Sequence, residues 1–175
     1  MGTAAVAPSG RALASLITRE IDQTSGKVLE LGPGTGIFTE RLVSRGVDQS
    51  DLTLVEQNPG FVRLLKQRFP RATILEIDAA ALGLIRQPRG DLFGAAVCGL
   101  GLRNMPVGHI EGIMRSAFSR MLPDAALYLF TYGRRCSVPA EVLERLGLAA
   151  EHFGIALLNL PPASVYRIVR VRNIQ

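Results

Sequence analysis

Residues 29–42 read LELGPGTGIFTERL, in which three glycines, Gly32, Gly34 and Gly36, lie between an apolar run and an amphipathic one. The apolar run predicts a buried strand, and the amphipathic run predicts a helix. Glycines in a strand-to-helix turn let a ligand approach the backbone at the carboxyl end of the strand. We therefore expect a ligand-binding loop at these glycines, with an acid, Glu30, directly before it.

Strand-like and helix-like patterns alternate along the rest of the chain. The expected helices are amphipathic or begin at a capping residue, and they cover residues 9–21, 36–46, 58–69, 108–122 and 139–147. The expected strands are short apolar runs, and they cover residues 27–32, 52–56, 72–78, 92–99 and 125–133. Two further strand-like runs, 151–160 and 164–171, are joined by only a short Pro-Pro turn, which favours an antiparallel pair. The earlier strands need parallel crossovers.

This order of elements predicts an α/β fold with a mostly parallel seven-stranded sheet, a C-terminal antiparallel strand pair and helices on both faces. We expect a single domain over residues 1–175, in which residues 1–22 form a leader loop and the first amphipathic helix. The apolar stripe of that helix is expected to pack against the sheet and consists of Leu13, Leu16, Ile17 and Ile21.

Composition narrows the class of protein. The chain has 47% hydrophobic residues, and no apolar run reaches the ~20 residues that span a bilayer. The first charge is Arg11, so the start lacks the pattern of a secretory signal, and we expect a cytoplasmic protein without a transmembrane segment. A net charge of +5 makes an anionic partner plausible. Because Cys98 and Cys136 have no metal-ligand spacing, we expect two free thiols and no metal site.

Two classes of ligand compete for the glycine loop. Dinucleotide-binding loops read G-x-G-x-x-G, whereas this loop reads G-x-G-x-G, and Ile37 stands where the third glycine of the dinucleotide motif would be. The carboxylate of Glu30 would repel a pyrophosphate in a partly desolvated crevice. S-adenosylmethionine has no phosphate and carries an ammonium and a sulfonium, so the same carboxylate would attract it. We therefore expect S-adenosylmethionine as the cofactor and S-adenosylhomocysteine as its product.

Acids also end the next two expected strands. Glu56 follows Gly36 by 20 residues, at the position where a carboxylate commonly binds both ribose hydroxyls. Asp78 could accept a hydrogen bond from the adenine amino group, with Ala79 beside the ring, and the helix amides beginning near Thr35 could face the cofactor's carboxylate. The expected cofactor-binding residues are Glu30, Gly32, Gly34, Thr35, Gly36, Glu56, Gln57, Asp78, Ala79, Cys98 and Gly99.

With the motifs VLELGPGTGIFTERL, LTLVEQNP and EIDA, the loop after the fourth strand and the closing strand pair, the chain resembles the class I S-adenosylmethionine-dependent methyltransferases over residues 9–172. That resemblance implies a Rossmann-like fold. A narrower similarity, carried by AVAPSGRALA, LFTYGRRCSVP and NLPPASVYRI, is to the bacterial phospholipid N-methyltransferases. It implies stepwise N-methylation of phosphatidylethanolamine towards phosphatidylcholine, by a protein peripherally attached to the inner face of the bacterial membrane. One departure is the turn Cys98-Gly99-Leu100-Gly101, where the family often has a Ser-Gly-Leu-Pro-like sequence.

Residues after the fourth and fifth strands are candidates for the substrate side. Tyr132, at the end of the fifth strand, is our candidate catalytic residue, because its hydroxyl or ring face could orient an amine that becomes cationic as it is methylated. A lipid phosphate needs a cation, and Arg103 and Arg134 follow the strands at the cofactor edge, with Asn104 as a further substrate-binding candidate. The expected partner is a phospholipid at an anionic membrane surface, bound by a monomer.

Other functions stay open on the sequence alone. Ribosomal RNA adenine dimethylases have similar cofactor motifs, but methylation of a base amine calls for an Asn-type acceptor and an aromatic platform in the turn after the fourth strand. The turn CGLGLRN supplies neither in the expected place, so a nucleic-acid substrate is not favoured. A methyltransferase of a soluble small molecule, a non-catalytic cofactor-binding module and a dehydrogenase are the remaining alternatives.

Overall fold

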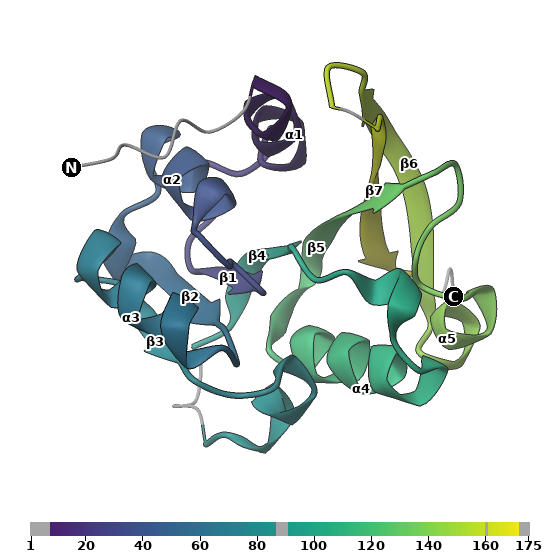
Figure 1. Ribbon diagram of the computed structural model, residues 1–175. Coiled ribbons are helices and arrows are strands. Elements are labelled where there is room, and N and C mark those ends of the chain that lie inside the picture. The colour runs from purple at the N-terminus through teal and green to yellow at the C-terminus, as the bar shows by residue number, and fades with distance from the viewer. Residues whose placement is uncertain (1–7, 87–90, 160, 172–175) are drawn as a thin grey trace.

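A computed structural model describes residues 8–86, 91–159 and 161–171 of the chain, and the expected leader loop over residues 1–7 lies outside these ranges. Seven strands form one sheet in the order β3-β2-β1-β4-β5-β7-β6 (Figure 1). The strands are β1 (Val28–Leu31), β2 (Leu52–Val55), β3 (Thr73–Leu75), β4 (Phe93–Cys98), β5 (Met121–Tyr132), β6 (Leu148–Ala156) and β7 (Ala163–Arg170).

The pairing of the strands confirms the predicted fold class. β1 pairs in parallel with both β2 and β4, β2 pairs in parallel with β3, and β4 pairs in parallel with β5. β7 is antiparallel to β5 and to β6, so the last two strands form the expected antiparallel pair. All the parallel strands therefore end at the same edge of the sheet, where ligands bind in folds of this kind.

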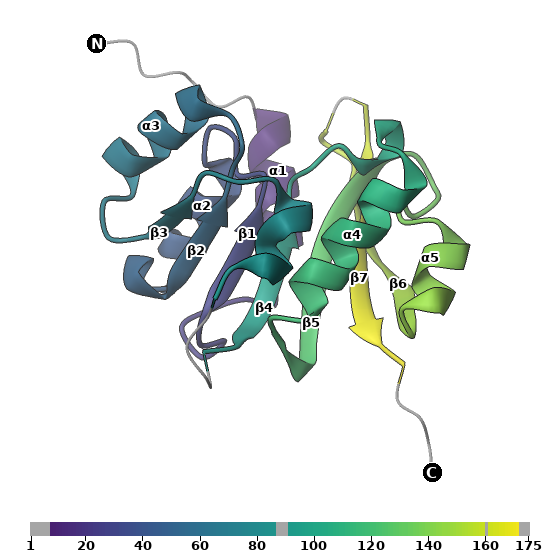
Figure 2. The ribbon, with the colours of Figure 1, turned by 90° about the horizontal axis from the view of Figure 1, so that it is seen from below.

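Helices cover both faces of the sheet (Figure 2). The helical elements are α1 (Pro8–Ile17), α2 (Ile37–Ser44), η1 (Gln49–Asp51), α3 (Pro59–Arg68), η2 (Ala79–Leu84), η3 (Leu102–Asn104), α4 (Val107–Phe118) and α5 (Ala140–Arg145). α1, α2 and α3 pack on one face, where Leu13, Ile17, Leu42 and Leu65 are buried against the sheet. η2, α4 and α5 pack on the other face around a second apolar cluster. Among the helices of the described residues, none combines the length and apolar character needed to span a bilayer.

Local chemistry explains where the helices begin and end. The side chain of Asn58 accepts hydrogen bonds from the amides of Gly60 and Phe61, and Pro59 occupies the first helical position of α3, as the sequence predicts. Gly46, at φ 94°, follows α2 in the left-handed conformation that commonly terminates helices.

Several boundaries differ from the sequence-based prediction. α1 ends at Ile17 rather than at residue 21, β3 ends at Leu75 rather than at residue 78, and β6 begins at Leu148 rather than at residue 151. β5 begins at Met121 rather than at residue 125, because Met121 pairs with Phe93 before an irregularity in the β4–β5 register. Met121 and Leu122 were expected to form the end of the preceding helix, but that helix, α4, ends at Phe118. β6 ends at Ala156 instead of continuing to residue 160, because the chain turns at Leu157.

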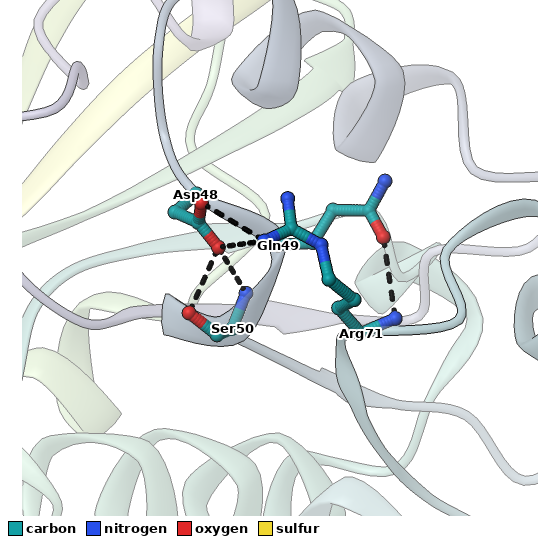
Figure 3. Close-up of polar contacts among 4 residues, drawn as sticks. All are labelled: Asp48, Gln49, Ser50 and Arg71. Atoms are coloured by element: carbon teal, nitrogen blue, oxygen red, sulfur yellow. Dashed lines mark hydrogen bonds and ion pairs between the residues drawn. The ribbon is translucent and has the colours of Figure 1, made fainter.

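A polar cluster fixes the opposite, amino-terminal edge of the sheet. Asp48 caps η1 by accepting hydrogen bonds of 2.8 Å from both the amide and the hydroxyl of Ser50 (Figure 3). Arg71, just before β3, pairs with Asp48 at 3.2 Å, and its amide donates to Gln49 at 3.3 Å. The amide of Ser50 and the other bonds at Asp48 lower the pKa of that carboxyl. These contacts connect the segments that precede β2 and β3.

Candidate functional site

Three acidic residues lie at or near the carboxyl ends of neighbouring parallel strands. The register places Leu31 of β1 beside Val55 of β2, and Val55 beside Leu75 of β3. Glu30 lies within β1 and Glu56 directly follows β2. Asp78 lies three residues after β3, where it caps η2. The three acids are neighbours because β1, β2 and β3 are adjacent in the sheet. The alternation of strands and helices predicts parallel strands but not this order.

The glycine loop connects β1 to α2, and its three glycines all have positive φ values. A Cβ at Gly32 would lie 2.4 Å from the side chain of Leu100, and one at Gly36 would lie 2.6 Å from the ring of Phe69, so packing excludes side chains at both positions. A Cβ at Gly34 would meet nothing within 4 Å. Gly34 therefore leaves its backbone open to a ligand, while the other two glycines hold the loop against the protein.

Glu30 is fully buried beneath this loop. One carboxylate oxygen accepts a hydrogen bond of 2.6 Å from the hydroxyl of Thr39 on α2, and the other has no hydrogen-bond partner. Burial raises the pKa of Glu30 to about 7, and the bonds from Thr39 oppose this shift. A buried acid with one unsatisfied oxygen favours a nearby positive charge, which would stabilise its ionised form. The ammonium and sulfonium of S-adenosylmethionine match this requirement.

Glu56 braces the glycine loop from the neighbouring strand. Its carboxylate accepts hydrogen bonds from the amide of Gly34 at 3.1 Å and from the amide of Asn58 at 2.9 Å, and the side chain is buried. The same group could accept hydrogen bonds from both hydroxyls of a ribose beside Gly34.

A narrow pocket extends from Glu56 towards Asp78. Its walls include Gly32, Gln57 and Ala79 together with the apolar side chains of Val55, Ile77, Leu100, Met105 and Ile113. Asp78 accepts a hydrogen bond of 2.8 Å from the amide of Ala80, and its second oxygen lies 3.4 Å from Nε2 of His109. The pocket therefore combines apolar walls with a hydrogen-bond acceptor, the combination that an adenine ring and its amino group require.

The remaining expected cofactor residues occupy different surroundings. Thr35 is exposed in the loop, and its carbonyl accepts a hydrogen bond from Arg68. A Cβ at Gly99 would lie 2.6 Å from the carbonyl of Gly32, so Gly99 is required for close approach of the two loops. The side chain of Cys98 points into the apolar core, where burial raises the pKa of its thiol to about 12. Cys98 could therefore act on a cofactor only through its backbone.

On the substrate side, Tyr132 lies at the end of β5 and is half exposed. Its ring packs edge-on against Phe130, with centroids 5.5 Å apart, and Phe130 packs in the same way against Phe38 in the first turn of α2, at 5.9 Å. This row of aromatic rings leads from α2, the helix after the glycine loop, to Tyr132. We call the carboxyl edge of the sheet at Tyr132 the rim. The guanidinium of Arg103, in η3 after β4, donates a hydrogen bond to the carbonyl of Tyr132.

The structure separates the two arginines that were expected to bind a phosphate. Arg103 lies beside Tyr132, and Asn104 is exposed next to it in η3. Arg134 instead lines a hollow with His152, Ser164 and Tyr166, and its carbonyl accepts a hydrogen bond of 2.6 Å from the hydroxyl of Tyr166. Tyr166 belongs to the apolar cluster under α4 and α5, whereas the ring of Tyr132 lies on the α1 and α2 face. Arg103 is therefore the better placed of the two to act with Tyr132.

Two residues of the site, Thr39 and His109, were not among those predicted from the sequence. His109 faces Asp78 from the first turn of α4, and Thr39 holds Glu30 from α2. The signal for Thr39 is a polar residue three positions before the buried Leu42, on the face of α2 that packs against the sheet. His109 has no such signal, because its position depends on how α4 packs against η2.

Comparisons with known proteins agree with this geometry. Residues 14–82 match the family model of the ribosomal RNA adenine dimethylases. The chain is 32% identical over 170 residues to the ornithine lipid N-methyltransferase of Singulisphaera acidiphila, an alignment that covers 93% of this chain and 86% of that enzyme. It is 45% identical over 65 residues to ribosomal RNA small subunit methyltransferase A of Synechococcus sp. (strain JA-3-3Ab), but spans only 22% of that protein.

Among solved structures, the glycopeptide N-methyltransferase MtfA in complex with S-adenosylmethionine superposes with a TM-score of 0.69 at 14% identity, over 97% of this chain and 99% of that one. That likeness concerns the fold. The acid-lined glycine loop, the fold and the alignment with the lipid enzyme together show that the cofactor is S-adenosylmethionine. The chain belongs to the class I S-adenosylmethionine-dependent methyltransferases, in the same family as the ornithine lipid N-methyltransferase of Singulisphaera acidiphila.

Proposed function

We propose that the enzyme methylates the head-group amine of a phospholipid, converting phosphatidylethanolamine and then its mono- and dimethyl derivatives towards phosphatidylcholine. The observation that carries this proposal is the contact between Arg103 and the carbonyl of Tyr132. It places a cation suited to a phosphate at the backbone of the residue whose aromatic side chain suits a methylated ammonium, at the edge that holds the cofactor loop.

Transfer of the methyl group forms a nitrogen–carbon bond and breaks the sulfur–carbon bond of S-adenosylmethionine, whose electrons return to sulfur to give S-adenosylhomocysteine. The residues of the rim have to align the amine with the methyl group, which can contribute several kcal/mol to catalysis. In this proposal Arg103 binds the lipid phosphate and Tyr132 orients the amine. The ammonium must release a proton to solvent water before attack, and desolvation against Tyr132 and Phe130 favours the neutral amine.

The identity of the long alignments, rather than their extent, favours a lipid over RNA. The match to the RNA dimethylase model covers residues 14–82, which carry α1 to η2 and the cofactor residues but end before β4. Two longer alignments include the half that carries Arg103 and Tyr132. The alignment to the lipid N-methyltransferase covers 93% of this chain at 32% identity, and that to a probable ribosomal RNA small subunit methyltransferase A of Halobacterium salinarum covers 81% at 26% identity. The turn Cys98–Gly101 also offers no aromatic side chain on which a base could stack.

An ornithine lipid is a second candidate substrate, because the relative that covers most of this chain is an enzyme for that lipid. Both lipids present a primary amine near a membrane surface, but only phosphatidylethanolamine also presents the phosphate for which Arg103 is suited. The two substrates are therefore distinguished by the role of Arg103.

The test is transfer of a labelled methyl group from S-adenosylmethionine to four substrates side by side: vesicles containing phosphatidylethanolamine, vesicles containing an ornithine lipid, ribosomal RNA and free ethanolamine. We expect label in the phosphatidylethanolamine fraction, and a larger loss with Arg103→Ala on that lipid than on the ornithine lipid. Label in RNA alone, or in free ethanolamine at an equal rate, would overturn the proposal. We further propose that the enzyme works as a peripheral protein at the inner face of the bacterial membrane.

A further inference from the structure

The turn between β6 and β7 exposes large apolar side chains. Leu157 and Leu158 are 74% and 78% exposed, and Ile155, the last residue but one of β6, is half exposed. In Figure 1 the described part of this turn, which follows β6, lies at the top of the view. Adjacent exposed leucines at the tip of a hairpin mark a surface that meets an apolar partner.

The backbone holds these leucines outwards. The amide of Asn159 donates a hydrogen bond of 3.2 Å to the carbonyl of Ala156, which closes a four-residue turn with Leu157 and Leu158 at its two central positions. Asn159 itself is buried at the base of the turn. Turns of this kind favour Gly, Pro, Asn, Asp and Ser at the tip, so two leucines there do not serve the turn itself.

The tip lies close to Tyr132, our candidate catalytic residue at the carboxyl edge of the sheet. Tyr132 pairs with Ala163 of β7, and Ala163 pairs with Ala156 of β6. Two strand spacings of about 5 Å therefore separate Tyr132 from the base of the tip, a distance of about 10 Å. A surface that receives the leucines is at the same time close to the site of methyl transfer.

The charges around the tip have one sign. Arg103 lies in the loop after β4, and Arg134 and Arg135 lie in the loop after β5, where all three are exposed. The segments 99–110, 131–140 and 152–171 contain no Asp or Glu. An apolar tip flanked by arginines without acids complements a bilayer surface with anionic head groups, because both the apolar and the charged parts gain on binding.

We propose that Leu157 and Leu158, in the described part of the β6–β7 turn, form a membrane-insertion tip, and that both side chains enter the boundary between head groups and acyl chains of an anionic bilayer. Arg103, Arg134 and Arg135 then face the lipid phosphates, and the rim at Tyr132 opens towards the head groups. This inference rests on the proposed function for its biological purpose, but the insertion itself is a separate physical claim.

Insertion is tested directly by fluorescence, because the chain contains no Trp. In the full chain, Leu158→Trp introduces a single reporter at the tip, and Leu84→Trp introduces a matched reporter at a leucine that is 88% exposed in η2, away from the rim. With vesicles of phosphatidylethanolamine and phosphatidylglycerol, we expect a blue shift and quenching by brominated lipids for the tip reporter alone. No shift at the tip, or equal shifts at both positions, would overturn the proposal.

A second experiment measures binding and turnover without a reporter. The double variant Leu157→Ser/Leu158→Ser removes apolar surface without adding charge, and Leu84→Ser is its matched control. Sedimentation with the same vesicles should show at least about tenfold weaker binding for the double variant, since each leucine loses its burial in lipid. Unchanged affinity for S-adenosylmethionine confirms that both variants are folded. Vesicle binding equal to that of the unmodified enzyme would overturn the proposal.

Turnover separates this proposal from the proposed function. On vesicles the double variant should lose at least about tenfold in rate, and on short-chain phosphatidylethanolamine dissolved as monomers it should match the unmodified enzyme. If no lipid amine is methylated in either form while the tip reporter still inserts, the proposed function fails and the tip stands. If the tip instead joins two copies of the chain, sedimentation velocity will show dimers that the double variant abolishes, and the membrane proposal fails.

Discussion

Replacing Glu30 by Gln should abolish a coupling between cofactor binding and pH. Burial raises the pKa of Glu30 from 4.5 to about 7, so the acid is largely protonated below neutral pH in the protein without cofactor. A cation within ~4–6 Å typically lowers the pKa of an acid by about 1–3 units. S-adenosylmethionine should therefore bind best to ionised Glu30, and its binding at lower pH should release a proton.

The magnitude follows from the size of this shift. The rise in the pKa of Glu30 from 4.5 to about 7 corresponds to about 3 kcal/mol, a cost of ionisation that the cofactor's positive charge can offset. If binding lowers the pKa by about 2 units, the affinity should rise about tenfold from about pH 6 to about pH 8, and close to 0.8 protons, roughly, should leave on binding at the lower value. Glu30→Gln should bind more weakly at the higher pH and show neither effect.

Titration calorimetry in buffers with different enthalpies of ionisation measures both the affinity and the protons released. Glu141→Gln, at an exposed acid in the first turn of α5, is the matched control and should retain the pH dependence. Affinity independent of pH in the unmodified protein, or an equal pH dependence in Glu30→Gln, would refute the reasoning.

The same shift predicts how stability without cofactor depends on pH. Because the pKa of Glu30 is higher in the folded than in the unfolded chain, its contribution to stability is fully present below about pH 4.5 and is lost as the pH rises through about 7. Glu30→Gln should therefore be more stable than the unmodified protein above neutral pH, by on the order of 1–3 kcal/mol. This separates a loss of affinity in the variant from a loss of folding.

Substitutions of Glu56, Tyr132 and Arg103, with Arg134→Ala as a control for the last, test the rest of the site. Glu56→Ala removes an acceptor for both ribose hydroxyls and should weaken S-adenosylmethionine binding at least about tenfold by calorimetry, whereas an unchanged Kd would exclude a role for Glu56 in the cofactor site. Tyr132→Phe should lower kcat more than it raises the Kd for cofactor, and an unaltered kcat would remove the hydroxyl from the reaction. Arg103→Ala should raise the KM for monomeric short-chain phosphatidylethanolamine roughly tenfold, whereas Arg134→Ala should leave this KM near its original value; the reverse order would contradict the assignment.

The features predicted from the sequence are those governed by local chemistry. Glycines with positive φ, a capping Asn58 and alternating apolar runs specify the strand–loop–helix units, and the acids near the ends of these strands lie along one edge because the strands are parallel. The boundary of β5 was not predictable, because Met121 joins the strand only through an irregular pairing with Phe93.

Details that depend on packing between distant segments were not predictable either. The pattern of residues does not say which face of β4 is covered by α4, so it could not show that Cys98 points into the core. The contact of His109 with Asp78 depends on how α4 packs against η2. The side of the rim on which each arginine lies depends on the path of the loops after β4 and β5, and here the structure distinguishes Arg103 from Arg134.

The most direct test of a lipid amine as the substrate is thin-layer analysis of cellular lipids. The cells express this chain, contain phosphatidylethanolamine and have no methylated lipids of their own. The variant Glu56→Ala, made at the same level, is the matched control. We predict mono-, di- and trimethylated derivatives of phosphatidylethanolamine in cells with the unmodified chain, and a strong reduction of all three with the variant. An unchanged lipid profile, in cells whose purified protein is folded and binds S-adenosylmethionine, would contradict the assignment of a lipid amine as substrate.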